Sequence, residues 1–190
     1  MADQVEVVNK ALIFIGESPV DSIDSDEKGV QLSRVIWNST RDAVLRAGLW
    51  HFARKQATLA LADEKPIVDW THILELPDDY IRMVRTEEDV KYEIYGNRVY
   101  SHDQVFRCVY ISRVEEVGKW DPLFVDAMAM KLAYQLALPI TDNRALMADA
   151  EALYMKYVSR ARTVDSQDST PKDLHPDLWD IVRISSYAPD

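Results

Sequence analysis

The sequence predicts an α+β fold with a body of four helices, a small antiparallel β subdomain inserted between the second and third helices, and an extended C-terminal arm. Apolar residues recur at three- and four-residue spacing in three segments, which is the period of a helix packed on one face, and a fourth segment is rich in Ala and Met. From Gln56 to about Ser112 the pattern changes to short runs separated by turn residues, which is typical of strands. We therefore expect one domain over residues 1–165 and an arm over 166–190.

The first two helices are predicted over about residues 2–16 and 25–47. In the first, an apolar stripe ends where Gly16 and Pro19 stop the helix. Asp24 and Glu27 are three residues apart and predict an N-cap and capping box for the second. The second helix is apolar on two sides, so we expect it to contact two neighbours, within the fold or across a subunit boundary. The residues of the first stripe are Val5, Val8, Leu12 and Ile15, and the two sides of the second helix are Val30, Trp37 and Val44, and Leu32, Ile36, Ala43 and Ala47.

Short apolar runs separated by turn residues in the central region predict five strands and one tight hairpin. Gly96 and Asn97 form a two-residue connection of the kind in which both residues take positive φ. The predicted strands are residues 68–76, 80–85, 92–95, 98–100 and 105–111. This pattern predicts a β subdomain over about residues 56–112.

Two further helices are predicted over about residues 122–138 and 142–164. Asp121 followed by Pro122 is a typical helix start, and Pro139 is expected to end that helix. Thr141 and Asp142 are the expected caps of the last helix. Its predicted apolar stripe is Leu146, Ala150, Leu153 and Tyr157.

The arm is rich in Ser, Asp and Pro but keeps a set of large apolar residues, which usually marks a contact surface. We expect it to be a docking arm, with packing on its own domain and disorder as alternatives. Trp179 is the expected anchor. The expected docking residues are Leu174, Leu178, Trp179, Ile181, Ile184 and Tyr187.

The formal charge of -10 and the pI near 4.9 argue against wrapping nucleic acid, since such binding needs many Lys and Arg. The single cysteine, Cys108, excludes an intramolecular disulfide and a multi-cysteine zinc site, and is expected in the core. A reducing cytoplasm fits this best. No secretory signal is expected, and no apolar run approaches the roughly 20 residues that a membrane span needs.

The sequence offers no constellation typical of catalysis. It has no nucleophile-elbow or Cys-His pattern and no glycine-rich phosphate loop. Four scattered histidines lack zinc-site spacing, and the pairs Asp78-Asp79 and Glu87-Glu88 suit turns or solvated faces. We expect no enzyme activity, no cofactor and no metal site. The histidines are His51, His72, His102 and His175.

The charges are unevenly distributed along the chain. Residues 30–60 carry five basic residues against Asp42, whereas the first 29 residues carry seven acidic residues against two lysines. A solvated helix face, complementary charge between neighbouring subunits and a DNA-facing strip are the three interpretations. The basic strip is Arg34, Arg41, Arg46, Arg54 and Lys55.

Several segments, in order, resemble the tail tubular protein A family, the head-to-tail adaptors of podoviruses. His51 stands where relatives often have Asn, which puts any role for that side chain in doubt. The resemblance covers roughly residues 5–168, and no motif aligns in the arm. Its segments are ALIFIGESPV at 11–20, RDAVLR at 41–46, GLWHFA at 48–53, LPDDY at 76–80 with Arg82, YGNRVY at 95–100, residues 122–133, and the last helix ending at Ala161-Arg162.

The resemblance implies a structural virion protein, assembled in the cytoplasm of the bacterial host, that forms a ring of about twelve copies. The expected ring contacts are Trp37, Arg34, Arg41 and Arg46. The ring would lie between the portal protein and the tail nozzle or tail fibres and would continue the channel through which double-stranded DNA passes. An acidic average surface suits a channel in which DNA slides without sticking. The alternative is a phage nucleic-acid-binding or DNA-packaging accessory protein that uses the basic strip.

Overall fold

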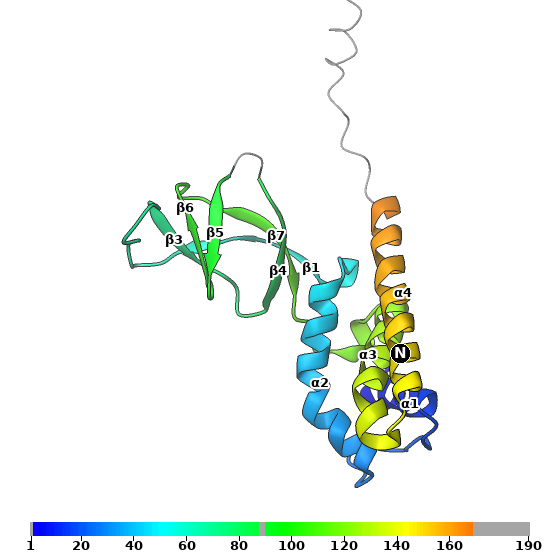
Figure 1. Ribbon diagram of the computed structural model, residues 1–190. Coiled ribbons are helices and arrows are strands. Elements are labelled where there is room, and N and C mark those ends of the chain that lie inside the picture. Colours follow the sequence, from blue (N-terminus) through cyan, green and yellow to red (C-terminus); the bar gives the residue numbers. More distant parts are fainter. Residues whose placement is uncertain (1, 88–89, 169–190) are drawn as a thin grey trace, which may run out of the picture.

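The computed structural model describes residues 2–87 and 90–168, and in that part the α+β prediction is confirmed. The helical body consists of α1 (Gln4–Phe14), α2 (Lys28–Ala47), α3 (Pro122–Thr141) and α4 (Arg144–Asp168). The β subdomain leaves the C-terminal end of α2 and projects to one side of the body (Figure 1). Two short 3-10 helices, η1 (His51–Ala53) and η2 (Val117–Lys119), flank it. The arm residues expected to dock lie outside the described residues.

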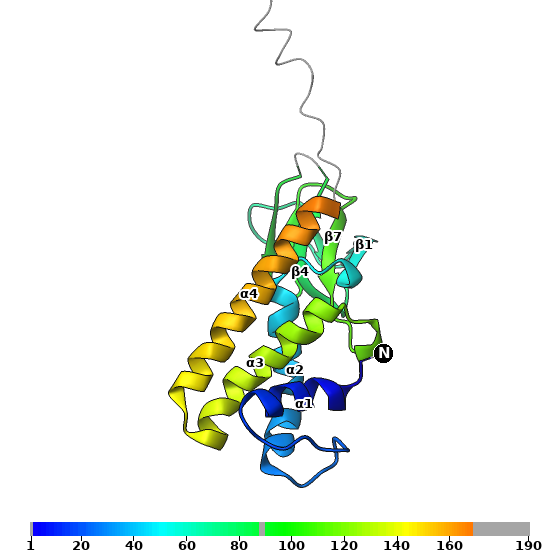
Figure 2. The same ribbon diagram turned by 90° about the vertical axis from the view of Figure 1, so that its right-hand side faces the viewer.

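Helix α3 is the centre of the body. It contacts α1, α2 and α4, and α1 crosses it while α4 runs alongside (Figure 2). Its side chains are buried on several sides of the helix. They include Phe124, Met128, Leu132 and Leu136. Because three other helices pack around α3, its apolar residues are not confined to one face.

Aromatic side chains join α2 to the start of α3. Trp37 stacks on Trp120 with ring centroids 5.7 Å apart, and Trp50 meets Phe124 edge-on at 4.9 Å. The Trp50 indole also donates a 2.8 Å hydrogen bond to the Val44 carbonyl, so its polar atom is satisfied within the core. These contacts bury the exit of α2 and set the direction in which the chain enters the β subdomain.

The β subdomain contains two antiparallel sheets. Sheet A has the order β1-β7-β4 and sheet B the order β2-β3-β6-β5. Leu59 alone separates β1 from β2, so this bent segment supplies a strand to each sheet. A second hydrophobic core of Leu59, Leu74, Leu76, Val99, Phe106, Cys108 and Tyr110 lies inside the subdomain, which confirms the expected burial of the cysteine. The strands are β1 (Arg54–Thr58), β2 (Ala60–Leu61), β3 (His72–Glu75), β4 (Tyr80–Thr86), β5 (Tyr92–Tyr95), β6 (Arg98–Ser101) and β7 (Arg107–Ser112).

The predicted strands differ from the structure in three places. Strands β1 and β2 were not predicted, because β1 is an edge strand of mostly polar residues and β2 has only two residues, so neither shows an apolar alternation. The strand predicted at 68–76 begins only at His72, since Asp69 takes a positive φ of 62° and breaks the extended chain. The hairpin between β5 and β6 is confirmed, but only Gly96 has positive φ, as a type II′ turn requires.

Several predicted helix ends were wrong. Helix α2 starts at Lys28 without a side-chain cap, because Ser22 and Ser25 bond the Asp24 and Glu27 amides and hold this stretch in turns. Asp121 does cap α3, as predicted, by accepting from the Leu123 amide at 2.8 Å.

Pro139 does not end α3, which continues to Thr141. A proline so close to a helix end removes only one backbone hydrogen bond. The last turn is supported instead by Lys28, which donates to the Pro139 carbonyl at 2.7 Å. Asp142 then closes α3 in the left-handed region, and Asn143, not Thr141 or Asp142, caps α4 through the amides of Ala145 and Leu146.

With these three extra residues, α3 is the one helix in the described part of the chain that is long and apolar enough to cross a membrane by length and composition. This corrects the expectation that no run approaches that length. More than half of its apolar window is buried against other parts of the protein, which is the usual environment of a core helix.

Candidate assembly surfaces

A polar joint connects the helical body to the β subdomain. Arg41 on α2, only 4% exposed, bonds Asp42 at 3.0 Å and lies 3.6 Å from a Glu115 carboxylate oxygen. Asp42 also accepts from Arg113 at 3.0 Å, just after β7. The pair of arginines and the two carboxylates therefore form a chain of alternating charges between α2 and the end of the β subdomain.

Backbone carbonyls complete this joint. Arg46 of α2 donates to the Ile81 carbonyl of β4 at 2.9 Å, and Arg82 of β4 donates back to the Gly48 carbonyl at 3.2 Å. Gly48 ends α2, where helical carbonyls lack partners and carry partial negative charge. These reciprocal bonds hold β4 against the end of α2.

Asp79, just before β4, makes a further polar contact inside the β subdomain. Burial disfavours its charge, but hydrogen bonds from Lys55 and Tyr110 outweigh this, so the pKa of Asp79 lies below its ordinary value. Burial, and then the bond to Asp79, raise the pKa of Tyr110 to about 12. Asp79 is thus a structural carboxylate that ties β1 to β7.

The expected ring-contact residues have different environments. Trp37 is 7% exposed in the core and Arg41 is buried in the joint. Arg46 is exposed but bonds Ile81, and Arg34 is exposed with Asp24 3.8 Å away. The structure therefore does not bring these four residues together on one free surface.

The other members of the basic strip also have partners inside the chain. Lys55 bonds Asp79 at 2.6 Å, and Arg54 donates to the Leu49 carbonyl at 3.5 Å. Sequence spacing could not show this, because the partners of the strip come from the β subdomain and its flanking loops.

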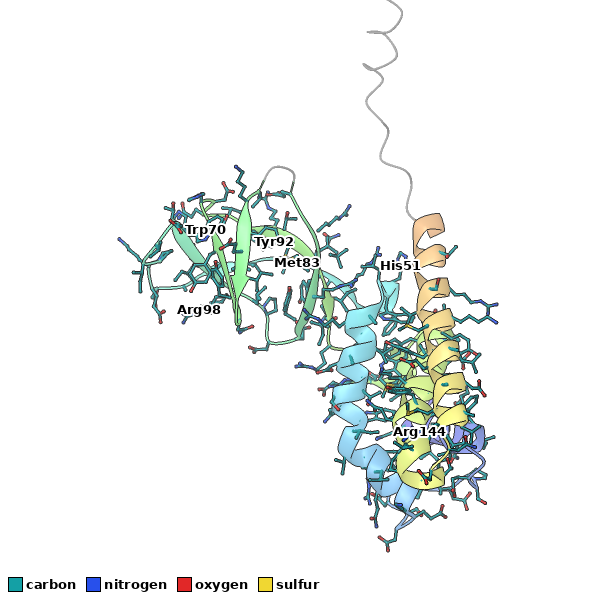
Figure 3. The ribbon with its side chains drawn as sticks, in the orientation of Figure 1. His51, Trp70, Met83, Tyr92, Arg98 and Arg144 are labelled. Atoms are coloured by element: carbon teal, nitrogen blue, oxygen red, sulfur yellow. The ribbon has the colours of Figure 1, made fainter. Side chains whose placement is uncertain are left out.

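An exposed apolar tip lies at the end of the β subdomain away from the body. We define the tip as Leu61, Ile67, Val68 and Tyr95; Ile67 is 98% exposed and the other three are exposed. Trp70 and Arg98 lie beside it (Figure 3). The Trp70 ring packs at a tilt against His102 with ring centroids 4.9 Å apart, and Arg98 pairs with Glu64. Sequence analysis missed this surface, although its Pro66-Ile67-Val68 run between charged residues was a usable signal.

The described residues that were weighed for catalysis are placed in other surroundings. Among the described residues, no group of three His, Cys, Asp or Glu side chains is placed to hold a metal ion. Asp79 is engaged by Lys55 and Tyr110, while His72 lies opposite Ser101 in sheet B. Burial raises the pKa of the Cys108 thiol, which disfavours the reactive thiolate.

The two-part fold, its rigid joint and its apolar tip are features of a structural protein that acts by binding other proteins. A family model described as tail tubular protein matches residues 5–113, more than half of the chain, from α1 to the end of β7. The chain therefore belongs to the tail tubular protein family, structural components of the bacteriophage tail. No curated protein matches the chain.

Proposed function

We propose that the chain is a head-to-tail adaptor that forms a ring of about twelve copies between the portal and the tail nozzle or tail fibres of a short-tailed bacteriophage. The single observation that supports this most is membership of the tail tubular protein family. The ring would continue the DNA channel, and the subunits would assemble in the host cytoplasm before entering the virion.

The joint suits this role because a ring closes only if each subunit presents its contact surfaces at a fixed angle. Bonds from α2 to β4 and to Arg113 supply that rigidity. Arg34 and Arg46 are the exposed members of the expected ring contacts, while Trp37 and Arg41 would act by supporting α2 from inside. The arm, residues 166–190, would dock on the portal or on a neighbouring subunit.

The alternative of a nucleic-acid-binding accessory protein has less support. It depends on the basic strip, yet the strip's cations bond to groups of the same chain. The overall charge of -10 also opposes DNA binding, whereas it suits a channel through which DNA slides.

The test is the mass of the complex formed with the portal ring of the same phage, measured by native mass spectrometry with the protein alone as control. We expect a step from portal to portal plus about twelve copies, the stoichiometry of a closed ring. Absence of any association, with both proteins folded, would reject the adaptor role. A salt-dependent DNA shift in the same preparation would favour the alternative.

A further inference from the structure

A small apolar hollow opens beside η1, where three parts of the body meet. It has a volume of about 100 Å³, enough for one aliphatic side chain. Leu49 and Phe52 line it from the exit of α2, Leu123 from the start of α3, and Ala161 from α4. We call this the η1 hollow; Trp50, His51 and Asp121 complete its lining.

The outer face of sheet A continues from this hollow and is basic. Residues opposite one another in antiparallel strands share a face. The register places Arg54 and Arg82 beside Ile111 in one row, and Gln56 and Arg85 beside Val109 in the next. Arg107 follows opposite Thr58. The face therefore carries Arg54, Arg82, Arg85 and Arg107, with Glu87 paired to the last at 2.8 Å.

The hollow and the basic face are adjacent. Arg54 donates to the carbonyl of Leu49, which lines the hollow. Beyond it, a groove of about 400 Å³ runs over the face, with Gln56, Arg85 and Arg107 among its lining. An apolar site is thus followed by a basic groove.

The C-terminal end of α4 lies close to the η1 hollow, and the chain continues from there. Ala161 lines the hollow, and α4 ends at Asp168, about 10 Å further along the helix axis. Both views show this end of α4 at the level of the β subdomain, opposite the end of the body where α2 begins (Figures 1 and 2). Residues 169–190 follow, with four aspartates against Lys172 and Arg183 and a set of large apolar residues that includes Leu174 and Leu178.

We propose that in the free subunit residues 169–190 fold back on their own chain, placing an apolar side chain in the η1 hollow and aspartates beside Arg85 and Arg107, the exposed arginines of the groove. The lengths allow this: Leu174 is six residues beyond Asp168, a reach of up to about 20 Å. The chain's own segment is tethered next to the site, which gives it a high effective concentration there. This docking concerns the free subunit, so it does not depend on the proposed ring.

Disulfide trapping in the full-length chain tests the proposal. Leu178→Cys is combined either with Leu123→Cys in the hollow or with Leu138→Cys, an exposed leucine at the opposite end of the same helix. With oxidised glutathione as oxidant, the first pair should form an intrachain disulfide at least about tenfold faster than the second, since the tether favours only the near site. The single Leu178→Cys variant reports any reaction with Cys108.

A charge reversal tests the second part of the docking. Arg85→Glu should slow trapping of the Leu123→Cys pair by about threefold, whereas Arg144→Glu, at the far end of α4, should leave it unchanged. Equal trapping at the two leucine positions would overturn the proposal. Disulfides found only between two chains would overturn it as well, because the occupant would then be a second copy.

Discussion

Arg41 shows how a charge is retained inside this protein. Its guanidinium group is buried beside α2 but has two carboxylate neighbours, Asp42 and Glu115. Removing one partner of a buried ion pair lowers the free energy of unfolding by more than the intact pair contributes, because the other charge remains buried without a partner. The joint is therefore sensitive to single substitutions in a way that exposed ion pairs are not.

Arg41→Ala should lower the free energy of unfolding by about 2 kcal/mol, since it removes charged hydrogen bonds from a buried site. Arg34→Ala is the matched control on the same helix, and should change it by less than about 0.5 kcal/mol because its ion pair is exposed. Urea unfolding at neutral pH measures both. Equal effects of the two substitutions would contradict the structural role of the joint.

The lowered pKa of Asp79 predicts that the protein loses stability in acid. Its pKa is lower in the folded protein than in the unfolded chain, so the folded state favours the charged form. The resulting stabilisation is present above the unfolded pKa of about 3.9 and is lost as the pH falls through the lower folded value. In Asp79→Asn, stability should therefore fall less steeply with pH below about 4 than in the unchanged protein. Chemical unfolding from pH 6 to 3 measures the two slopes, and identical slopes would refute the assignment.

At the scale of elements, α1 and α2 approach closely at Gly29. A Cβ built there would lie 2.6 Å from Cδ2 of the buried Leu12. Alanine normally favours a helix over glycine, but here its methyl group would overpack the contact. Helix propensity and packing thus oppose each other at this position.

Gly29→Ala should destabilise the protein by about 1 kcal/mol, because overpacking outweighs the gain in helix propensity. Combining it with Leu12→Ala, which removes the clashing atom, should cost less than the sum of the two single substitutions. Thermal unfolding of the four proteins in this cycle measures the coupling. Strict additivity would show that the two helices separate to accept the methyl group.

The elements that could be predicted from the sequence are those whose signal is local. Spacing of apolar residues located α1, α2 and α4, the Asp-Pro start and the Ala- and Met-rich composition located α3, and Gly96 located the hairpin. The predicted end of α3 at Pro139 was wrong because neighbouring groups, including Lys28, support the last turn of the helix. Strand β1 was missed because its pairing with β7 depends on residues about 50 positions away, which no local pattern shows. The same limit applies to the joint and the tip.

At the scale of the whole molecule, the tip is the most exposed apolar surface of the β subdomain. Ile67 is almost fully exposed, so its side chain adds little to the stability of the subunit. An exposed apolar group at the end of a rigid projection is well placed to contact a neighbouring subunit or a tail protein.

Ile67→Asp should leave the free energy of unfolding within about 0.5 kcal/mol of its original value, because the side chain is exposed in the subunit. It should weaken assembly on the portal by about tenfold or more, since a carboxylate would be buried without a partner. Sedimentation of portal mixtures measures assembly, with Ile67→Leu as the conservative control. Normal assembly of the aspartate variant would exclude the tip from the contacts.

The two hydrophobic cores differ in whether their residues come from one continuous segment of the chain. The β subdomain is built from one continuous segment, β1 to β7, whereas the helical body needs residues from both sides of it. During synthesis the β subdomain can therefore complete its core while α1 and α2 still lack α3, the helix against which both pack. Ribosome-bound chains in which β7 has left the exit tunnel and α3 has not would hold a finished β unit next to uncovered helix faces, the stage at which chaperones have most to shield.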